Sequence, residues 1–239
     1  PVRSKLHKIY NNTVKLQRLV LEIIQFRKLE KGKEHLVADR YNPVVLINEV
    51  IADLELPAQE KGVKILFNDS EAPDEIITDA DKFQRIVMNL VSNAIKYNRT
   101  DGEVVIRATK MIGGIEVSVS DTGMGIESSL LPKIFEPFGI SSERRRGGSP
   151  TYRSSGLGLA VTKSLVNLLG AQIEVSSTVG EGTTFICSFT NLTRTEVSPT
   201  LSKSEEAPEY LVEMNDLMES ENSVDGSTKR SHILVVDDD

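Results

Sequence analysis

The chain has 239 residues and a formal net charge of −7, from 35 acidic and 28 basic side chains. Hydrophobic residues make up 39% and charged residues 26%, which is typical of a chain that folds around a core. The acidic excess argues against a nucleic-acid-binding domain, which would need a basic face. The single cysteine, Cys187, excludes an intrachain disulfide and a cysteine-rich zinc site. No apolar stretch approaches the roughly 18 residues that span a bilayer, and the first residues show no signal-peptide pattern.

The first part of the chain predicts one long helix over residues 4–30. Its apolar residues recur at spacings of three and four and form a broad face. Two interpretations stay open, an ordinary core helix or half of a helical hairpin used for dimerisation. We favour the hairpin, because this helix precedes the globular part and has no helical partner of its own.

Residues 35–192 alternate between strand-like and helix-like stretches, which predicts an α/β domain. The spacing predicts helices over 43–61, 79–97 and 158–169. Alternating or apolar runs predict strands over 36–41, 63–68, 103–110, 115–120, 172–176 and 183–190. The pair Gly113-Gly114 indicates a hairpin turn between two of these strands. Residues 139–155 are rich in Ser, Gly and Arg and lack periodicity, so they form either a functional or a disordered loop.

Residues 193–230 change in character. They are rich in Glu, Ser and Thr and predict a tethering linker, with at most a short helix near 209–218. Residues 231–239 run from an apolar segment into an acidic cluster, which is typical of the first strand of another α/β domain. We therefore expect the chain to be a piece of a longer protein that has sensor or membrane segments.

The predicted helix over 79–97 carries a polar stripe. Asn89, Asn93 and Lys96 fall on one face of it. Carboxamide oxygens bind hard cations and a lysine offsets phosphate charge, so the stripe suits a polyphosphate with Mg²⁺. A merely solvated helix face is the alternative.

Three further motifs indicate a ligand site. Asp121 follows a predicted strand and precedes Gly123 and Gly125, whose backbone can approach a ligand closely. A carboxylate at this position suits an exocyclic amine such as that of adenine. A plain Asp/Gly turn is the alternative interpretation. Gly156 and Gly158 open a helix, whose first amides attract phosphate. Between these motifs, Phe135-Glu136-Pro137-Phe138 predicts a rigid hydrophobic hinge.

These motifs, in this order and followed by Gly180-Glu181-Gly182-Thr183-Thr184-Phe185, resemble the ATP-binding domain of the sensor histidine kinases in the GHKL ATPase superfamily. Residues 26–32 resemble the end of the dimerisation and phosphoacceptor hairpin of that family, and residues 233–239 the start of a receiver domain. The resemblance thus implies a hybrid kinase with four parts. These are the second hairpin helix (1–34), the ATP-binding domain (35–192), a linker (193–230) and the first receiver strand (231–239).

The resemblance implies a two-layer α/β sandwich, the Bergerat fold, with a mobile lid over about 139–155 that Phe135 and Phe138 would anchor. It implies ATP and Mg²⁺ as ligands, with Asn93 and Asn89 at the metal and Asn89 and Lys96 as catalytic residues. Asp121 would bind the adenine amine. The other implied nucleotide contacts are Tyr97, Gly123, Gly125, Ile126, Phe138, Gly156, Leu157, Gly158 and Thr184.

The implied activity is transfer of the ATP γ-phosphoryl group to a histidine on a dimerisation helix of the same or a partner protomer. Relatives that hydrolyse ATP carry a glutamate as general base where this chain has Asn89, and a carboxamide takes no proton from water near neutral pH. A degenerate regulatory scaffold and a hydrolytic ATPase are the alternatives. The implied partners are a receiver domain and a second copy of the protein, with no nucleic acid. The expected location is the cytoplasm, with a parent protein anchored at a membrane as one arrangement.

The chain departs from the family pattern in two places. It lacks the phosphoacceptor motif, and His7, His35 and His232 do not stand where the acceptor is expected, so this chain should not phosphorylate itself. In the lid, Ser154 stands where relatives often have glycine. The arginines 144–146 could clamp phosphates or form a solvated tip. Asp237 and Asp238 resemble the Mg²⁺-binding acids of a receiver.

Overall fold

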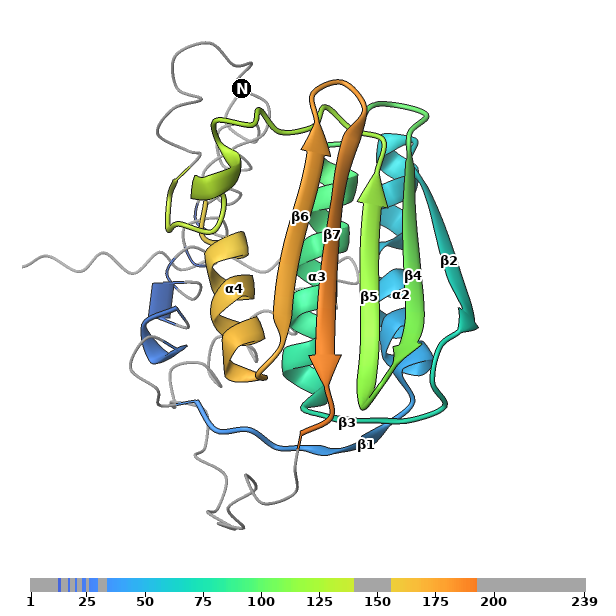
Figure 1. The fold of residues 1–239 in the computed structure, drawn as a ribbon. Coiled ribbons are helices and arrows are strands. Elements are labelled where there is room, and N and C mark those ends of the chain that lie inside the picture. Colours follow the sequence, from blue (N-terminus) through green and yellow to red (C-terminus); the bar gives the residue numbers. More distant parts are fainter. Residues whose placement is uncertain are drawn as a thin grey trace, which may run out of the picture. The chain divides into compact units, whose positions relative to one another are not determined.

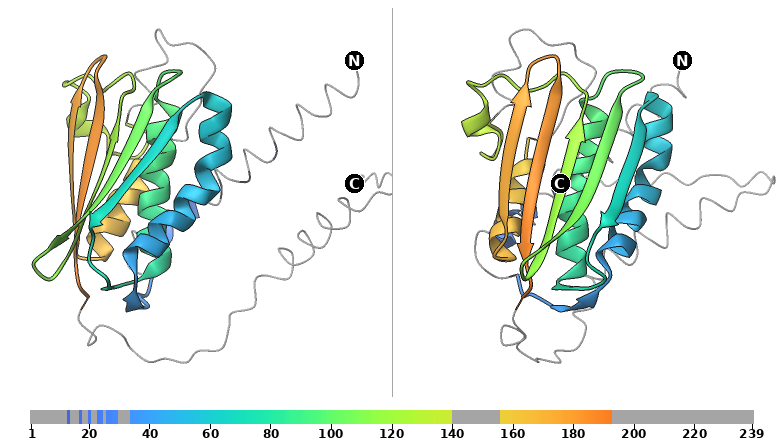
Figure 2. Two further views of the ribbon diagram at one scale, coloured as in Figure 1. Left: turned by 90° about the vertical axis from the view of Figure 1, so that its right-hand side faces the viewer. Right: turned by 45° about the vertical axis from the view of Figure 1, so that its right-hand side comes forward.

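The structure, a computed structural model, describes residues 34–139 and 156–192 and nine helical positions from Thr13 to Leu29. Described residues of the predicted first helix are helical, as expected. The domain that follows is a two-layer sandwich, with one mixed sheet and helices on one of its faces (Figure 1). Figure 2 shows the two layers edge-on. The predicted fold class is thereby confirmed.

The main sheet has five strands in the order β2-β4-β5-β7-β6. Strands β2 and β4 are parallel, and the other neighbours are antiparallel. Helix α3 lies in the chain between the two parallel strands, as such a pairing requires. The strands are β2 (Lys64–Glu71), β4 (Glu103–Met111), β5 (Gly114–Asp121), β6 (Gln172–Thr178) and β7 (Gly182–Thr190).

The hairpin between β4 and β5 corrects the predicted turn by one residue. Its loop is Ile112-Gly113, and Gly113 has the positive φ of 74° that such a turn needs. Gly114 already belongs to β5, where it pairs with Thr190 on β7. It is glycine because a Cβ there would lie 1.9 Å from the carbonyl oxygen of Phe189.

Three helices cover one face of the sheet, and their starts follow local capping chemistry. They are α2 (Pro43–Lys61), α3 (Ala80–Lys96) and α4 (Gly158–Leu168). The Asn42 side chain accepts hydrogen bonds from two amides of α2, and Asp79 caps α3 by accepting from the Lys82 amide at 3.1 Å. Asp79 also bonds the Lys82 ammonium at 3.0 Å, and Glu34 lies 3.7 Å from the same ammonium. The start of α3 is therefore fixed by a buried ionic cluster.

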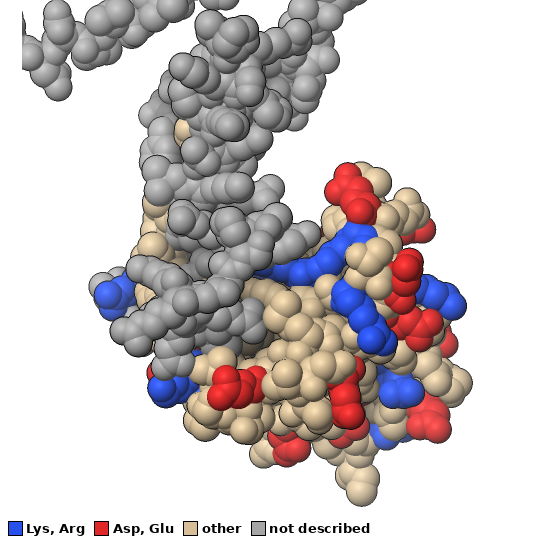
Figure 3. All heavy atoms as spheres, turned by 90° about the horizontal axis from the view of Figure 1, so that it is seen from above, with Lys and Arg blue, Asp and Glu red and all other residues tan. Residues whose placement is uncertain are grey.

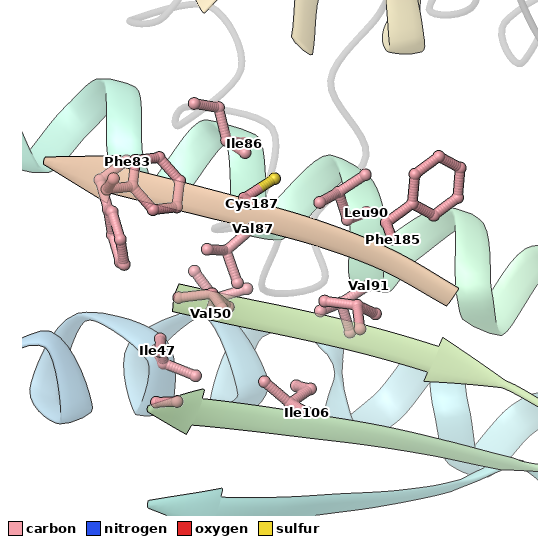
Figure 4. Close-up of a cluster of buried hydrophobic side chains, with 14 of the residues drawn as sticks. Ile47, Val50, Phe83, Ile86, Val87, Leu90, Val91, Ile106, Phe185 and Cys187 are labelled. Carbon is pink, nitrogen blue, oxygen red and sulfur yellow. The ribbon is translucent and has the colours of Figure 1, made fainter. Parts of the chain in front are cut away.

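The core forms between the apolar face of α3 and the sheet (Figure 4). Phe83 is fully buried and packs 4.9 Å from the ring of Phe189 on β7. Cys187 lies in the same layer, and burial raises the pKa of its thiol to about 12. Helix α3, which the periodicity of the sequence predicts, thus covers this face of the sheet.

Two small elements, β3 (Ile76–Thr78) and a single 3-10 turn, η1 (Leu131–Lys133), were not predicted. Strand β3 pairs antiparallel with β1 (Asp39–Tyr41), the last part of the strand predicted over 36–41, in a separate two-stranded sheet. Three-residue segments are too short to show periodicity. The predicted linker, its short helix, the receiver strand and all but the first residue of the long loop lie outside the described residues. Among the helical residues that are described, no segment is both long and apolar enough to cross a membrane.

Candidate nucleotide site

Several of the predicted motifs meet at one end of the sheet, where α3 and β5 both end. The loop after β5 lies against the last turn of α3, because the Met124 amide donates to the Tyr97 carbonyl at 3.2 Å. Gly123 allows this approach, since a Cβ there would lie 2.5 Å from the Tyr97 carbonyl oxygen. The loop after Asp121 and the end of α3, which are far apart in the sequence, therefore lie next to each other.

Asp121 is the last residue of β5 and shares the face of the sheet that α3 covers, because side chains alternate along a strand and Val117 and Val119 are buried there. Its carboxylate accepts a hydrogen bond from the Gly123 amide at 2.8 Å. Burial raises the pKa of Asp121, and hydrogen bonds from the backbone of Gly123 and Thr183 partly oppose that rise. A partly desolvated carboxylate is a strong acceptor for an amine.

The far side of this loop is held by the turn between β6 and β7. The Gly180 amide donates to the Met124 carbonyl at 2.9 Å, and the Ile126 amide donates to the Ser177 hydroxyl at 2.8 Å. Gly125 has a φ of 67°, and a Cβ on it would lie 2.1 Å from the Thr178 carbonyl oxygen. Loop 122–126 is therefore fixed on both sides.

A buried carboxamide that the sequence analysis missed ties the same loop to β4. The Asn98 side chain donates to the Glu103 carbonyl at 2.9 Å and accepts from the Thr122 hydroxyl at 3.2 Å. The Thr122 hydroxyl in turn accepts from the Glu103 amide at 2.9 Å. An Asn two residues beyond a helix is a weak signal in sequence, because only the fold shows which strand it meets.

The polar stripe of α3 reaches from α4 to the loop after β5. The Asn89 carboxamide donates to the Thr162 hydroxyl on α4 at 2.6 Å, and Gly158 leaves room for it, since a Cβ there would lie 2.6 Å from the Asn89 carboxamide oxygen. Asn93 is half-buried, and its side chain makes no hydrogen bond to any residue of the described ranges. The Lys96 ammonium lies 5.4 Å from the centre of the Tyr97 ring.

The two ends of the predicted lid meet beside α4. The Phe138 amide donates to the Gly156 carbonyl at 3.0 Å. Phe135 is the packed aromatic, with its ring 6.4 Å from that of Phe185, whereas Phe138 is 49% exposed and has a φ of 62°. The Phe135 ring therefore packs on β7, and the Phe138 backbone joins the two ends of the predicted lid. Leu157 is buried and begins α4 without a side-chain cap.

The structure corrects the prediction for Thr184. Its side chain lies on the face of the sheet that the helices leave uncovered, where its hydroxyl donates to Ser120 at 2.9 Å. Thr183 is paired with Asp121 across the β5–β7 ladder, is buried and lies 2.9 Å from the Ser177 hydroxyl. Sequence reasoning chose the wrong one of two adjacent threonines because only strand register decides which of them shares the face of Asp121. Thr183, and not Thr184, therefore shares the face of Asp121.

Figure 3 looks onto this end of the domain and shows charged side chains of both signs around an uncharged central area. Within the described ranges, no three His, Cys, Asp or Glu side chains are grouped closely enough to hold a metal ion. His35 is exposed, whereas His7 and His232 lie outside those ranges. Ser154 and the lid arginines, 144–146, also lie outside them.

The raised pKa of Asp121 predicts how the binding of a ligand that donates an amine hydrogen bond would depend on pH. Its raised pKa means that protonation begins at a higher pH than for an exposed aspartate, and the protonated acid is a weaker acceptor for an amine. We expect the affinity for an ATP analogue to fall as the pH is lowered from about 7 towards about 5. Calorimetry at several pH values checks this. An identical pH dependence in Asp121→Asn would assign the effect to the phosphates instead.

Comparison with known proteins agrees with this geometry. Residues 78–193 match the family described as histidine kinase-, DNA gyrase B- and HSP90-like ATPase. The chain is 34% identical over 196 residues to the hybrid signal transduction protein dokA of Dictyostelium discoideum, and 31% identical over 191 residues to the signal transduction histidine-protein kinase BarA of Escherichia coli. Each alignment covers 77% of this chain, which spans only 11% and 20% of the length of these relatives.

A solved structure extends the likeness to three dimensions. Full-length ShkA, crystallised in complex with AMPPNP, superposes with a TM-score of 0.69 at 26% identity over 80% of this chain and 39% of its own. The residues that match the family model, 78–193, contain α3, the Asp121 loop and α4, which are the elements that form the candidate site. Residues 78–193 therefore form a histidine kinase-, DNA gyrase B- and HSP90-like ATPase domain of the kind found in sensor histidine kinases.

Proposed function

We propose that this chain binds ATP with Mg²⁺ at the site between α3, the Asp121 loop and α4, and that it is the catalytic core of a hybrid sensor histidine kinase. The observation that carries the proposal is the contact between Tyr97 and the loop after Asp121. It brings an acceptor for an amine next to a stripe of carboxamides and a lysine. The AMPPNP complex of ShkA supports the same assignment.

The residues present suit such a ligand. Asp121 would accept a hydrogen bond from the adenine amine, with Thr183 and Ser177 beside it. Asn93, whose carboxamide makes no hydrogen bond within the described ranges, would hold Mg²⁺ with Asn89 nearby, and Lys96 would contact phosphate. The first turn of α4 after Gly156 and Gly158 would face the phosphates.

The proposed reaction is transfer of the γ-phosphoryl group to a histidine. The bond from the γ-phosphorus to the bridging oxygen breaks, a bond to an imidazole nitrogen forms, and ADP leaves. Neutral imidazole is already nucleophilic, so no base is needed to generate the nucleophile. Asn89 cannot accept a proton from water, and its bond to Thr162 holds the carboxamide in place. Bound Mg²⁺ would neutralise charge on the phosphates.

The proposed partners follow from the segments outside the described ranges. The acceptor histidine would be supplied by a dimerisation helix of the same or a partner protomer in a homodimer. The hybrid assignment rests on residues 231–239, which resemble the start of a receiver domain, and on the likeness to dokA, which is named a hybrid signal transduction protein. A receiver aspartate would then accept the phosphoryl group.

Replacing Asn93 by alanine tests the metal part of the proposal. We expect the affinity for AMPPNP with Mg²⁺ to fall at least tenfold, roughly the loss that follows removal of even an outer-shell metal partner. With EDTA in place of Mg²⁺, variant and wild type should bind alike. Asn48→Ala, an exposed carboxamide on α2, is the matched control. Equal loss with and without Mg²⁺ would remove Asn93 from the metal site.

Transfer itself is tested with labelled ATP and a separate polypeptide that bears a phosphoacceptor histidine helix. Label on the histidine, lost on acid treatment, supports the kinase. Binding of AMPPNP without transfer would favour a regulatory scaffold, and steady phosphate release by the chain alone would favour a hydrolase.

A further inference from the structure

The carbonyl end of α3 is held by a cation from another helix. Lys61 is the last residue of α2 and is followed by Gly62, the C-cap, with a φ of 70°. The Lys61 ammonium donates a hydrogen bond to the Lys96 carbonyl, at the last residue of α3. The final carbonyls of a helix lack partners within it and carry partial negative charge, so they attract a cation.

The next carbonyl along the chain, that of Tyr97, binds the loop after Asp121. The Tyr97 carbonyl accepts from Met124 in the loop after Asp121, as described above. Two consecutive carbonyls at the end of α3 therefore connect α2 and the Asp121 loop. The Lys96 side chain starts from the first of these peptide units, so a displacement there would move it.

The two lysines also interact through their charges. Burial lowers the pKa of Lys61, and the positive charge of Lys96 lowers it further. Like charges held together repel, and a polyphosphate next to Lys96 relieves that repulsion. The pair is thus better suited to a site that holds an anion than to an empty one.

We infer that Lys61 is a positioning residue for the phosphate side of the nucleotide site: by binding the end of α3 it fixes the peptide that carries Lys96 and directs the Lys96 ammonium towards the polyphosphate. This rests on the proposed function. Lys61 acts through Lys96, so its effect depends on the phosphates of the ligand and on the presence of Lys96.

The test compares AMPPNP with adenosine, which lacks phosphates, in the full 239-residue chain. We expect Lys61→Gln to weaken AMPPNP binding about three- to tenfold, the size of effect of a charge at a helix end in a partly buried site. Adenosine affinity should stay within about twofold, and Lys61→Arg should restore most of the AMPPNP affinity because it keeps the cation. Lys64→Gln, an exposed lysine at the start of β2, is the control.

A double-mutant cycle separates positioning from general stability. In a Lys96→Gln background, the further change Lys61→Gln should have little effect on AMPPNP affinity, because residues that act through one another are not additive. Additive losses, equal losses for AMPPNP and adenosine, or unchanged affinity in Lys61→Gln would each overturn the inference. So would unfolding of both Lys61→Gln and Lys61→Met, since the role would then be structural. If the wild type binds neither ligand, the proposed function fails and this inference fails with it.

Discussion

Replacing Asp121 by asparagine should abolish most nucleotide affinity while leaving the domain folded. The carboxylate is the charged acceptor of the proposed amine contact, and a hydrogen bond to a charged group contributes about 1.5–3 kcal/mol. We therefore expect AMPPNP binding to weaken roughly 10- to 150-fold. The Gly123 amide keeps an acceptor in the carboxamide oxygen of the variant, so the loop should retain its conformation.

Asp121→Asn should lower nucleotide affinity but should not lower the stability of the ligand-free domain. An acid whose pKa is raised by folding contributes stability that is present at low pH and lost as the pH rises through that pKa. At neutral pH the ionised, partly buried Asp121 is therefore unfavourable to the empty domain, and Asp121→Asn should unfold at the same or a higher temperature. Glu116→Gln, on the same strand but the other face, is the control. Wild-type affinity in Asp121→Asn would place the purine elsewhere.

Replacing Gly182 by alanine should damage both the fold and the site. Gly182 begins β7 with a φ of 134°, and a Cβ on it would lie 1.8 Å from the carbonyl oxygen of Asp121. Backbone strain and overpacking each cost about 1–3 kcal/mol, so we expect unfolding to be easier by about 3 kcal/mol or more. Because β7 must move away from β5 at Asp121, AMPPNP binding should be lost as well. Urea denaturation and calorimetry measure the two effects.

Gly180 offers a matched control within the same turn. It also has a positive φ, 84°, but a Cβ on it would meet nothing within 4 Å. Gly180→Ala should therefore show only the backbone cost of a left-handed residue, about 1–2 kcal/mol, and should keep its nucleotide affinity. Equal destabilisation of the two variants would mean that the close approach to Asp121 does not matter.

Helices were predicted better than strands, and the reason is physical. Helix α2 has the predicted bounds, because Pro43 and Gly62 mark its ends, and α3 differs only in that Asp79 and Tyr97 are caps. Periodicity and capping are local. Strand β1 is shorter than predicted, and β3 was not predicted. These two strands are stabilised by pairing with each other across many intervening residues, which no local pattern shows.

The same distinction applies to the site. Motif order indicated Asn89, Asn93 and Asp121, and the structure brings their segments together. The sequence analysis did not find Lys61, Asn98 or Thr183, because each acts through a contact with a distant backbone or strand. Register decided between Thr183 and Thr184, and no local pattern encodes register in a strand whose two threonines are adjacent.

The burial of Cys187 has a chemical consequence. It is the only thiol in the chain, and thiols react with oxidants and alkylating reagents as thiolates. With its pKa raised to about 12 and its side chain enclosed between α3 and the sheet, it is almost entirely protonated and shielded at physiological pH. We therefore expect this thiol to react with an alkylating reagent only when the domain opens, so that the rate of its labelling measures the rate of opening.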